Sequence, residues 1–517
     1  MKKHTMRFIS LIIIGIALSS CNDFLTENSQ DLSYITGYDD LDEILLGDVY
    51  LSPGTSTASN DISDTYMPYI HFMSDEVTQL IDVSKNINTP PRTTTRLFGY
   101  YTWQRDVTLG LDGSEVYDDG QDWKNIYKSI VSANVVLSGL SELSPKDDEE
   151  LLQAKRIKGE ALFCRAADLF LLVNLYADAY EPVNADQKPG VPVKLTDYAE
   201  IGSFTRASVK EVYQQIVSDL SEATVALKDN EEKSIYRINY AGACLFFSRV
   251  YLYMQDYNNA ISWAQKAIAE APQMVDLNTF SSPLFSKNNE SIMFTMGGNI
   301  IAENIYEYLL YGELYLQVGQ FVVANDLYNS FSDSDLRKSN FFHINEEAPN
   351  VVLYDKQTYE LIAQSSEISD CFTLRTAEAW LNLAEAYACS GDNLSAQNAM
   401  NTLLKNRVEN SAFQPILLDN AELVHFIREE RKKELCMEGH RWFDLRRYQV
   451  NEAYPETKTL YSVSSVIADY ELVRFDYYRL DPGDPAWTLP IPKYEMDYND
   501  SEGNNRDDRI PYNTINY

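Results

Sequence analysis

Apolar and polar positions alternate with a helical period in two segments of the chain, near 241–270 and 375–406. In each segment, large apolar residues on a first predicted helix precede alanines on a second, at the offsets of a tetratricopeptide unit. A short polar turn separates the two helices, at 255–258 in the first segment and at 390–392 in the second. One helix pair cannot bury its apolar face alone, so we expect further, more degenerate pairs.

Three upstream segments carry the same helical spacing and are the candidates for those further pairs. They cover 123–137, 157–176 and 208–227, and the last begins at Ser208 with Glu211 three positions later, a capping box. Residues 52–118, 271–375 and 448–517 lack a helical period and are rich in Pro, Gly and aromatic residues. The pattern predicts a mainly α fold, a superhelix of tetratricopeptide-like helix pairs with long irregular insertions and small β elements, including a strand near 291–295.

The N-terminus has the pattern of an export signal. A basic start precedes a short apolar run, and Leu18-Ser19-Ser20-Cys21 has the form of a bacterial lipobox. We therefore expect residues 1–20 to be a lipoprotein signal peptide and Cys21 to be lipidated. The apolar run is shorter than the roughly 20 residues that a membrane-spanning helix needs. The alternative is ordinary cleavage of a soluble secreted protein, with Cys21 incidental.

Composition narrows the classes of function. The chain has 517 residues and a formal net charge of -34, which disfavours binding to nucleic acid. It has no zinc-protease His pair, nucleophile elbow, phosphate-binding loop or dinucleotide-binding glycine motif. The sequence therefore predicts a protein that is not an enzyme, with no catalytic residues, no cofactor and no metal. The chain has 36 tyrosines, so some aromatic side chains can form binding surfaces.

Several blocks in the same order resemble the SusD/RagB family of outer-membrane nutrient-binding lipoproteins. They follow the lipobox and lie at 123–137, 159–178, 205–220, 427–447 and 489–499. The sharpest block reads Ile427-Arg428-Glu-Glu-Arg431 through Gly439-His-Arg441-Trp-Phe-Asp444-Leu-Arg446. On this resemblance the chain has an N-terminal SusD-like region at 21–230 and a C-terminal SusD/RagB region at 231–517.

The resemblance implies a cellular location and a role. The protein would be anchored by lipid in the outer membrane, face the cell exterior, and capture a glycan for a SusC-like TonB-dependent barrel. Two other interpretations stay open. The ligand could be a peptide, or the chain could be a helical-repeat scaffold lipoprotein that binds no small molecule.

The charged block near the C-terminus is interpreted as structural rather than ligand-binding. Its alternating charges predict an ion-pair network that clamps a helix, ended by Gly439, to the C-terminal segment. The Pro490–Pro492 stretch is predicted to be a rigid extended tie. The residues of this motif are Arg428, Arg431, Glu434, Glu438, Gly439, Arg441, Asp444, Arg446, Pro490 and Pro492.

Candidate ligand-binding residues are the aromatic ones in the long insertions, because flat rings stack on sugars. Tyr100, Tyr101 and Trp103, with Arg96 nearby, form the first group. Tyr306, Tyr308 and Tyr311 form the second. Packing of Tyr100, Tyr101 and Trp103 inside the insertion is an equally open alternative.

Overall fold

The computed structural model describes most of the chain. The residues it describes are 35–50, 66–82, 92–115, 121–198, 204–230, 234–296, 309–310, 313–314, 316–346, 348–349, 351–356, 368–499, 503–504 and 506–517. Cys21, Tyr306, Tyr308 and Tyr311 lie outside these residues, so the predictions for them stay predictions. Among the described residues, no helix is both long enough and apolar enough to cross a bilayer.

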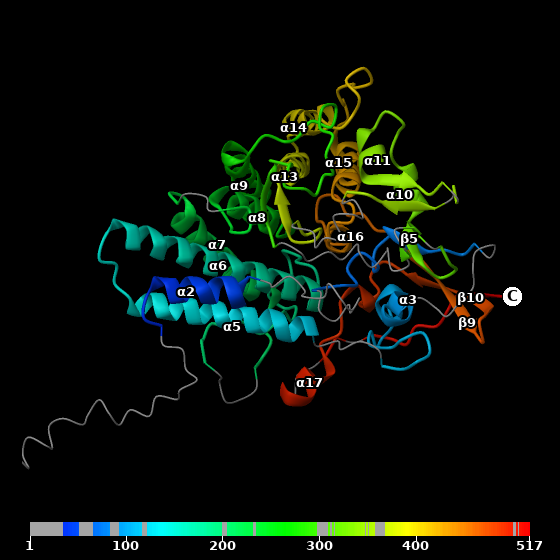
Figure 1. Ribbon diagram of the computed structural model, residues 1–517, viewed down its shortest axis with the longest axis horizontal. Helices are drawn as coiled ribbons and strands as arrows, with labels where there is room; N and C mark the ends of the chain where they lie inside the picture. Colours follow the sequence, from blue (N-terminus) through cyan, green and yellow to red (C-terminus); the bar gives the residue numbers. More distant parts are fainter. Residues whose placement is uncertain are drawn as a thin grey trace, which may run out of the picture.

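Antiparallel helix pairs form the body of the molecule (Figure 1). The longer helices are α5 (Gln121–Glu142), α6 (Asp148–Tyr176), α7 (Val209–Leu227), α8 (Tyr240–Tyr253), α9 (Tyr257–Glu270), α13 (Thr376–Cys389), α14 (Asn393–Lys405), α15 (Asn420–Glu434) and α16 (Arg441–Gln449). The shorter ones are α2 (Tyr38–Ile44), η1 (Leu45–Val49), α3 (Arg92–Arg96), α4 (Phe98–Tyr101), α10 (Asn325–Asn329), α11 (Leu336–Phe341), η4 (Pro485–Trp487) and α17 (Lys493–Asn499). The predicted mainly α, helix-pair fold is confirmed.

The two predicted helix pairs share one local design. In α9 the N-cap Asp256 accepts from the N–H of Asn259, and in α14 the N-cap Asp392 accepts from the N–H of Ser395. Such a cap satisfies a backbone donor that the first helical turn leaves open. Small, fully buried alanines then let the paired helices approach closely. Ser208 and Glu211 form the capping box predicted at the start of α7.

Small antiparallel sheets occupy the segments between helices. The strands are β1 (Val77–Gln79), β2 (Ile292–Thr295), β3 (Leu309–Leu310), β4 (Glu313–Leu314), β5 (Phe321–Val323), β6 (Phe342–Ile344), β7 (Val352–Tyr354), β8 (Thr373–Arg375), β9 (Leu460–Ala468), β10 (Glu471–Leu480) and β11 (Asn513–Asn516). They pair as β1–β5, β2–β8, β3–β4, β6–β7 and β9–β10–β11. The strand expected near 291–295 is β2.

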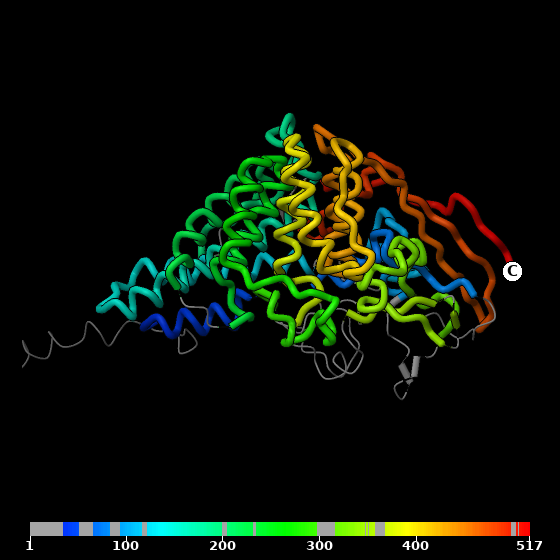
Figure 2. The backbone as a smooth tube through the Cα atoms, turned by 90° about the horizontal axis from the view of Figure 1, so that it is seen from above, coloured from blue at the N-terminus to red at the C-terminus, as the bar shows by residue number. Residues whose placement is uncertain are grey.

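The N-terminal insertion packs against the end of the chain. Val77 of β1 pairs with Val323 of β5, and the backbone N–H groups of Gln79 and Val463 both lie within hydrogen-bond distance of the Tyr101 hydroxyl. Figures 1 and 2 both show α2, α5 and α6 at one end of the long axis and the β9–β10 hairpin at the other. Contacts between distant parts of the sequence therefore decide which residues of the insertions reach solvent.

Candidate functional site

The charged block centres on a buried carboxylate, Glu434, at the end of α15. Arg407 donates to both of its oxygens at 2.9 Å, and Arg375 donates to Oε1 at 2.6 Å. Arg337 lies 3.4 Å from Oε2, and the Glu434 side chain is 0% exposed. Burial alone would raise the pKa of Glu434, but the charges of Arg407 and Arg375 hold it well below its usual range.

A second buried cluster joins α13, α15 and α16. Both oxygens of Glu385 accept from Arg447 at 2.7 Å, and Asp444 accepts from Arg431 at 2.9 Å. Burial opposes ionisation of Glu385, yet Arg447 lowers the pKa of this carboxyl to about 2. Arg428 lies 3.5 Å from Glu385, so this helix end is linked to α13 as well.

The structural interpretation of this block holds, with two corrections. The network ties α15 and α16 mainly to α13, β8 and the N-terminal insertion, where Arg441 donates to Asp75 at 2.7 Å. Of the ion-pair block, Arg446 and Arg428 reach the C-terminal segment. Arg446 donates to Thr488 at 3.1 Å, and Arg428 donates to the carbonyl of Tyr454 at 2.8 Å. The prediction that Gly439 ends the helix is wrong. Helix α15 ends at Glu434, and Gly439, with φ of +76°, belongs to the turn before α16.

Glu438 and the Pro490–Pro492 stretch also make contacts inside the protein. Glu438 accepts from Arg375 at 2.7 Å and from Lys356 at 2.6 Å. The stretch around Pro490 and Pro492 lies outside helices and strands, and the preceding Leu489 N–H donates to the carbonyl of Leu175 at 3.0 Å. The C-terminal segment is thus held against the end of α6.

Of the two alternatives for Tyr100, Tyr101 and Trp103, the structure shows packing inside the protein rather than exposure. Tyr100 and Tyr101 are each 2% exposed, and Trp103 is 1% exposed. The Tyr100 ring stacks on Tyr69 at a centroid distance of 3.9 Å, and the Trp103 indole N–H donates to the carbonyl of Met73 at 2.9 Å. The turn at 66–75 and the C-terminal hairpin cover these rings, so their faces are not available to a ligand. Arg96 lies in α3 and is partly exposed.

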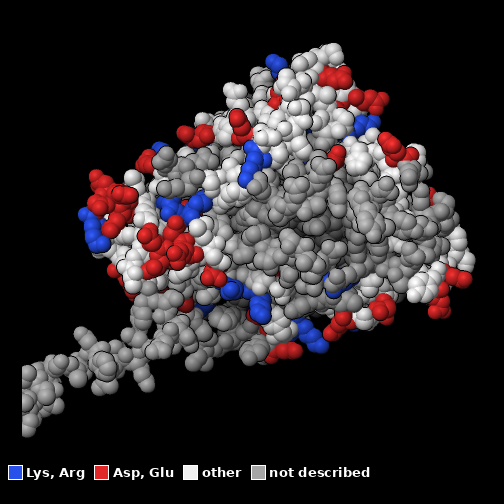
Figure 3. Space-filling model, in the orientation of Figure 1, with Lys and Arg blue, Asp and Glu red and all other residues white. Residues whose placement is uncertain are grey.

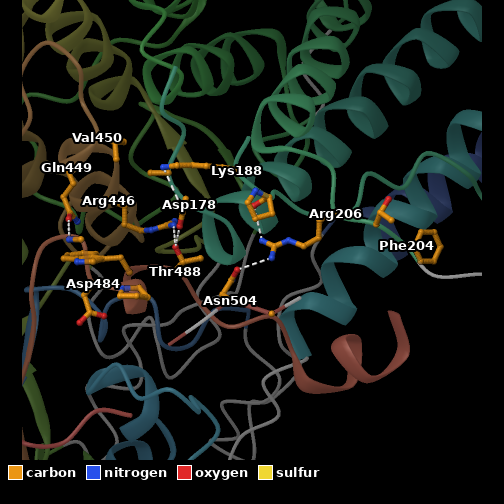
Figure 4. A pocket seen from close by; sticks show the side chains of 17 residues that line it. Asp178, Lys188, Phe204, Arg206, Arg446, Gln449, Val450, Asp484, Thr488 and Asn504 are labelled. Carbon is orange, nitrogen blue, oxygen red and sulfur yellow. Dashed lines mark hydrogen bonds and ion pairs between the residues drawn. The ribbon is translucent and has the colours of Figure 1, made fainter. Parts of the chain in front are cut away.

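A cavity of about 780 Å³ lies where α6, α16 and the C-terminal segment meet (Figure 4). The end of α6 contributes Asp178, the segment after it contributes Lys188, Phe204 lies a few residues before α7, and the end of α16 contributes Gln449. In Figure 4, Thr488 donates to Asp178, and the distance between their oxygens is 2.9 Å. Sequence reasoning missed this site because its walls come from four separate parts of the chain.

The walls of the cavity carry both donors and acceptors. Arg206 donates to the Asn504 side-chain oxygen at 3.2 Å, and the Gly483 N–H donates to the Gln449 side chain at 3.1 Å. Arg446 is buried and donates to the carbonyls of Asn174 and Ala177, and burial lowers its pKa to about 10. Asp178 is exposed at the cavity mouth. The arrangement suits a polar ligand with hydroxyl groups rather than an apolar one.

Exposed aromatic rings do occur, but on the C-terminal sheet. Tyr461 of β9 is 66% exposed, and Tyr512, just before β11, is 51% exposed. Their ring centroids are 6.1 Å apart, and Arg479 lies opposite Tyr461 in the β9–β10 register. The sequence analysis did not select these tyrosines because nothing local distinguishes them from the buried ones.

The surface charge is uneven. Acidic side chains gather at the end of the molecule formed by α2 and the start of α6 (Figure 3). The exposed acidic residues of these elements include Asp39, Glu43, Asp148 and Glu149. This end carries much negative charge, while the described cavity includes Lys188, Arg206 and Arg446.

Two family models match different halves of the chain. The model described as "Starch-binding associating with outer membrane" matches residues 95–252, and the one described as "SusD family" matches residues 329–505. The two matches include the long helices α5 to α7 and the buried ion-pair block of α15 and α16. Both the N-terminal and the C-terminal predicted regions therefore carry family sequence patterns.

Similar proteins agree with these matches. The chain is 24% identical over 395 residues to "SusD-like protein P2" of Formosa agariphila, covering 68% of this chain and 75% of that one. A SusD superfamily protein of Bacteroides thetaiotaomicron shares the fold, with a TM-score of 0.67, 21% identity and coverage of 91% and 100%. A laminarin-binding SusD-like protein has a TM-score of 0.59 and 19% identity, with coverage of 90% and 98%. The chain belongs to the SusD/RagB family.

Proposed function

We propose that the protein is a cell-surface lipoprotein that captures a glycan, an oligo- or polysaccharide, and delivers it to a SusC-like TonB-dependent outer-membrane transporter. The observation that carries this proposal is family membership in both halves of one continuous fold. A solved relative with the same fold is named as laminarin-binding, which supports a glycan as the ligand class. The lipobox at Cys21 supports an anchor in the outer membrane, facing the exterior.

The role is binding without catalysis. The sequence holds none of the nucleophile, zinc or phosphate motifs sought above, and much of the charged block is paired inside the protein. A carrier that hands its ligand on needs moderate affinity and fast release rather than a reactive group. Glycan capture by preformed polar contacts meets that need.

We place the glycan in the cavity between α6 and α16. Its volume of about 780 Å³ lies within the range of roughly 300–1,000 Å³ typical of small-molecule sites. Sugar hydroxyls both donate and accept, and the walls offer an ammonium at Lys188, a carboxylate at Asp178 and an amide at Gln449. The partly exposed ring of Phe204 adds an apolar surface.

Affinity electrophoresis tests both the function and the place. The chain from residue 22 onward is run through gels that contain plant, host or microbial polysaccharides, and we expect one polymer to slow it. The Lys188→Ala/Gln449→Ala variant should bind that polymer about tenfold more weakly, since two polar contacts of about 0.5–1.5 kcal/mol each are lost. Lys188 pairs with Glu181 at 3.0 Å. Lys158→Ala is the matched control, because Lys158 likewise pairs with a carboxylate, Glu222 at 2.9 Å, but lies outside the cavity.

A second variant distinguishes a wrong placement of the glycan from a wrong proposed function. If Tyr461→Ala/Tyr512→Ala abolishes retardation and the cavity variant does not, the glycan binds on the C-terminal sheet and the placement is wrong. If no polymer retards the wild-type chain, and isothermal titration with short oligosaccharides shows no heat, glycan capture is wrong. A peptide ligand or a scaffold role would then replace it.

A further inference from the structure

Two segments far apart in the sequence bring a histidine, a carboxylate and a thiol together. His71 comes from the turn at 66–75, and Asp370 and Cys371 come directly before β8. Their ligand atoms all lie within 4.8 Å of one another. The turn before α16 closes the third side, because a Cβ atom on Gly439 would lie 3.3 Å from the Cys371 sulfur. We propose that His71, Asp370 and Cys371 form a zinc-binding site.

The distances within the cluster fit the edges of a zinc coordination shell. His71 Nε2 lies 3.4 Å from the Cys371 sulfur and 3.8 Å from Asp370 Oδ2. With Zn–N and Zn–O bonds near 2.1 Å and a Zn–S bond near 2.3 Å, tetrahedral ligand atoms lie about 3.4–3.6 Å apart. The separation of 3.8 Å between His71 and Asp370 exceeds ordinary hydrogen-bond length. One ion between the three atoms would contact all of them.

A second carboxylate is placed to support the histidine. His71 Nδ1, the nitrogen that faces away from the cluster, lies 3.7 Å from Glu76 Oε2, and His71 is 0% exposed. No hydrogen bond to Nδ1 is formed within the described residues, although the atom is buried. Glu76 is itself held by the Met437 N–H at 2.7 Å and by the Ser74 hydroxyl at 3.2 Å. Histidines that bind zinc usually direct their second nitrogen to such a carboxylate.

The chemical types of the three ligands favour one kind of metal ion. Thiolate, imidazole and carboxylate together suit Zn²⁺, whereas Ca²⁺ and Mg²⁺ prefer oxygen ligands only. Three protein ligands leave a fourth position for water, which distinguishes this arrangement from a closed structural site. Cys371 is partly exposed while His71 and Asp370 are buried. The net charge of -34 raises the local concentration of cations.

Binding must displace protons, and this supplies an independent readout. A zinc-bound cysteine is a thiolate and a zinc-bound histidine is a neutral imidazole, so any protons that these groups carry must leave when the ion binds.

Zinc titration of the chain from residue 22 onward tests the site. After removal of metal with a chelator, we expect one Zn²⁺ per chain, with release of protons, measured by isothermal titration in buffers of different ionisation enthalpy. Cys371→Ser and Asp370→Asn should each weaken zinc binding by more than about tenfold, and Glu76→Gln by about 10- to 100-fold. Cys389→Ser is the matched control, because it removes another thiol, on α13, outside the cluster.

Cobalt substitution adds a spectroscopic readout for the sulfur ligand. Co²⁺ bound at this site should show a thiolate-to-metal absorption band that Cys371→Ser abolishes and Cys389→Ser keeps. The proposal is overturned if the wild-type chain binds zinc no more tightly than Cys371→Ser, or if its cobalt complex lacks the thiolate band. Circular dichroism of each variant establishes that it is folded.

Discussion

Glu434→Gln should destabilise the fold strongly, because it removes the charge at the centre of the buried arginine cluster. The substitution keeps the shape of the side chain but leaves Arg375, Arg407 and Arg337 facing a neutral amide. Each of these side chains is at most 1% exposed, so water does not replace the lost partner.

The expected loss of stability in Glu434→Gln is the balance of two opposing contributions. At an effective dielectric constant of 20, a charge pair about 4 Å apart contributes about 4 kcal/mol, and several such pairs converge on Glu434. Part of this is offset, since the variant no longer desolvates a carboxylate and the arginines keep other partners. Removal of one member of a buried pair costs about 3–5 kcal/mol in measured cases, and we expect a loss in this range.

Guanidinium denaturation followed by tryptophan fluorescence measures this loss. Trp442 and Trp487 stack at a centroid distance of 4.9 Å, with Trp442 in α16, the helix that follows the cluster. Glu422→Gln is the control. Glu422 is an exposed carboxylate in the first turn of α15, the helix that contains Glu434, and its substitution should change the free energy of unfolding by less than about 0.5 kcal/mol. In the Arg407→Met/Glu434→Gln double variant the two losses should be less than additive. A loss below about 1 kcal/mol for Glu434→Gln would refute the view that this network holds the fold together.

Two further predictions follow from the same structure, beside those for the cavity and the zinc site. Glu385 has a folded-state pKa of about 2 against 4.5 for a free glutamate, so its contribution of about 3 kcal/mol is present above pH 4.5 and is lost as the pH falls toward 2. Denaturation series between pH 2 and pH 6 should show this loss, and an equally steep acid dependence in Glu385→Gln would contradict the assignment. Trp103→Ala should destabilise the protein by about 3–5 kcal/mol, since it empties a buried site and removes the hydrogen bond to Met73. A folded Trp103→Ala chain of unchanged stability that has lost only glycan retention would restore the exposed-ring interpretation.

The sequence by itself determined the elements whose causes are local. The helical period and the capping aspartates near 256 and 392 specify two helix pairs, and Ser208 with Glu211 specifies the start of α7. Each of these signals acts within one or two turns of helix, so no distant partner can change it. The alternating charges of the block at 427–447 likewise indicated an ion-pair network, and the structure shows that this network is buried.

Only the tertiary structure decided what is exposed and what converges. Trp103 and Tyr461 both lie in segments without a helical period, yet one is 1% and the other 66% exposed, because burial depends on which segment packs above a ring. His71 and Cys371 are 300 residues apart along the chain, and their contact at 3.4 Å exists because β8 and the N-terminal turn pack together. The walls of the cavity are likewise joined by the fold alone. Such contacts depend on the packing of whole elements, which no local pattern of residues records.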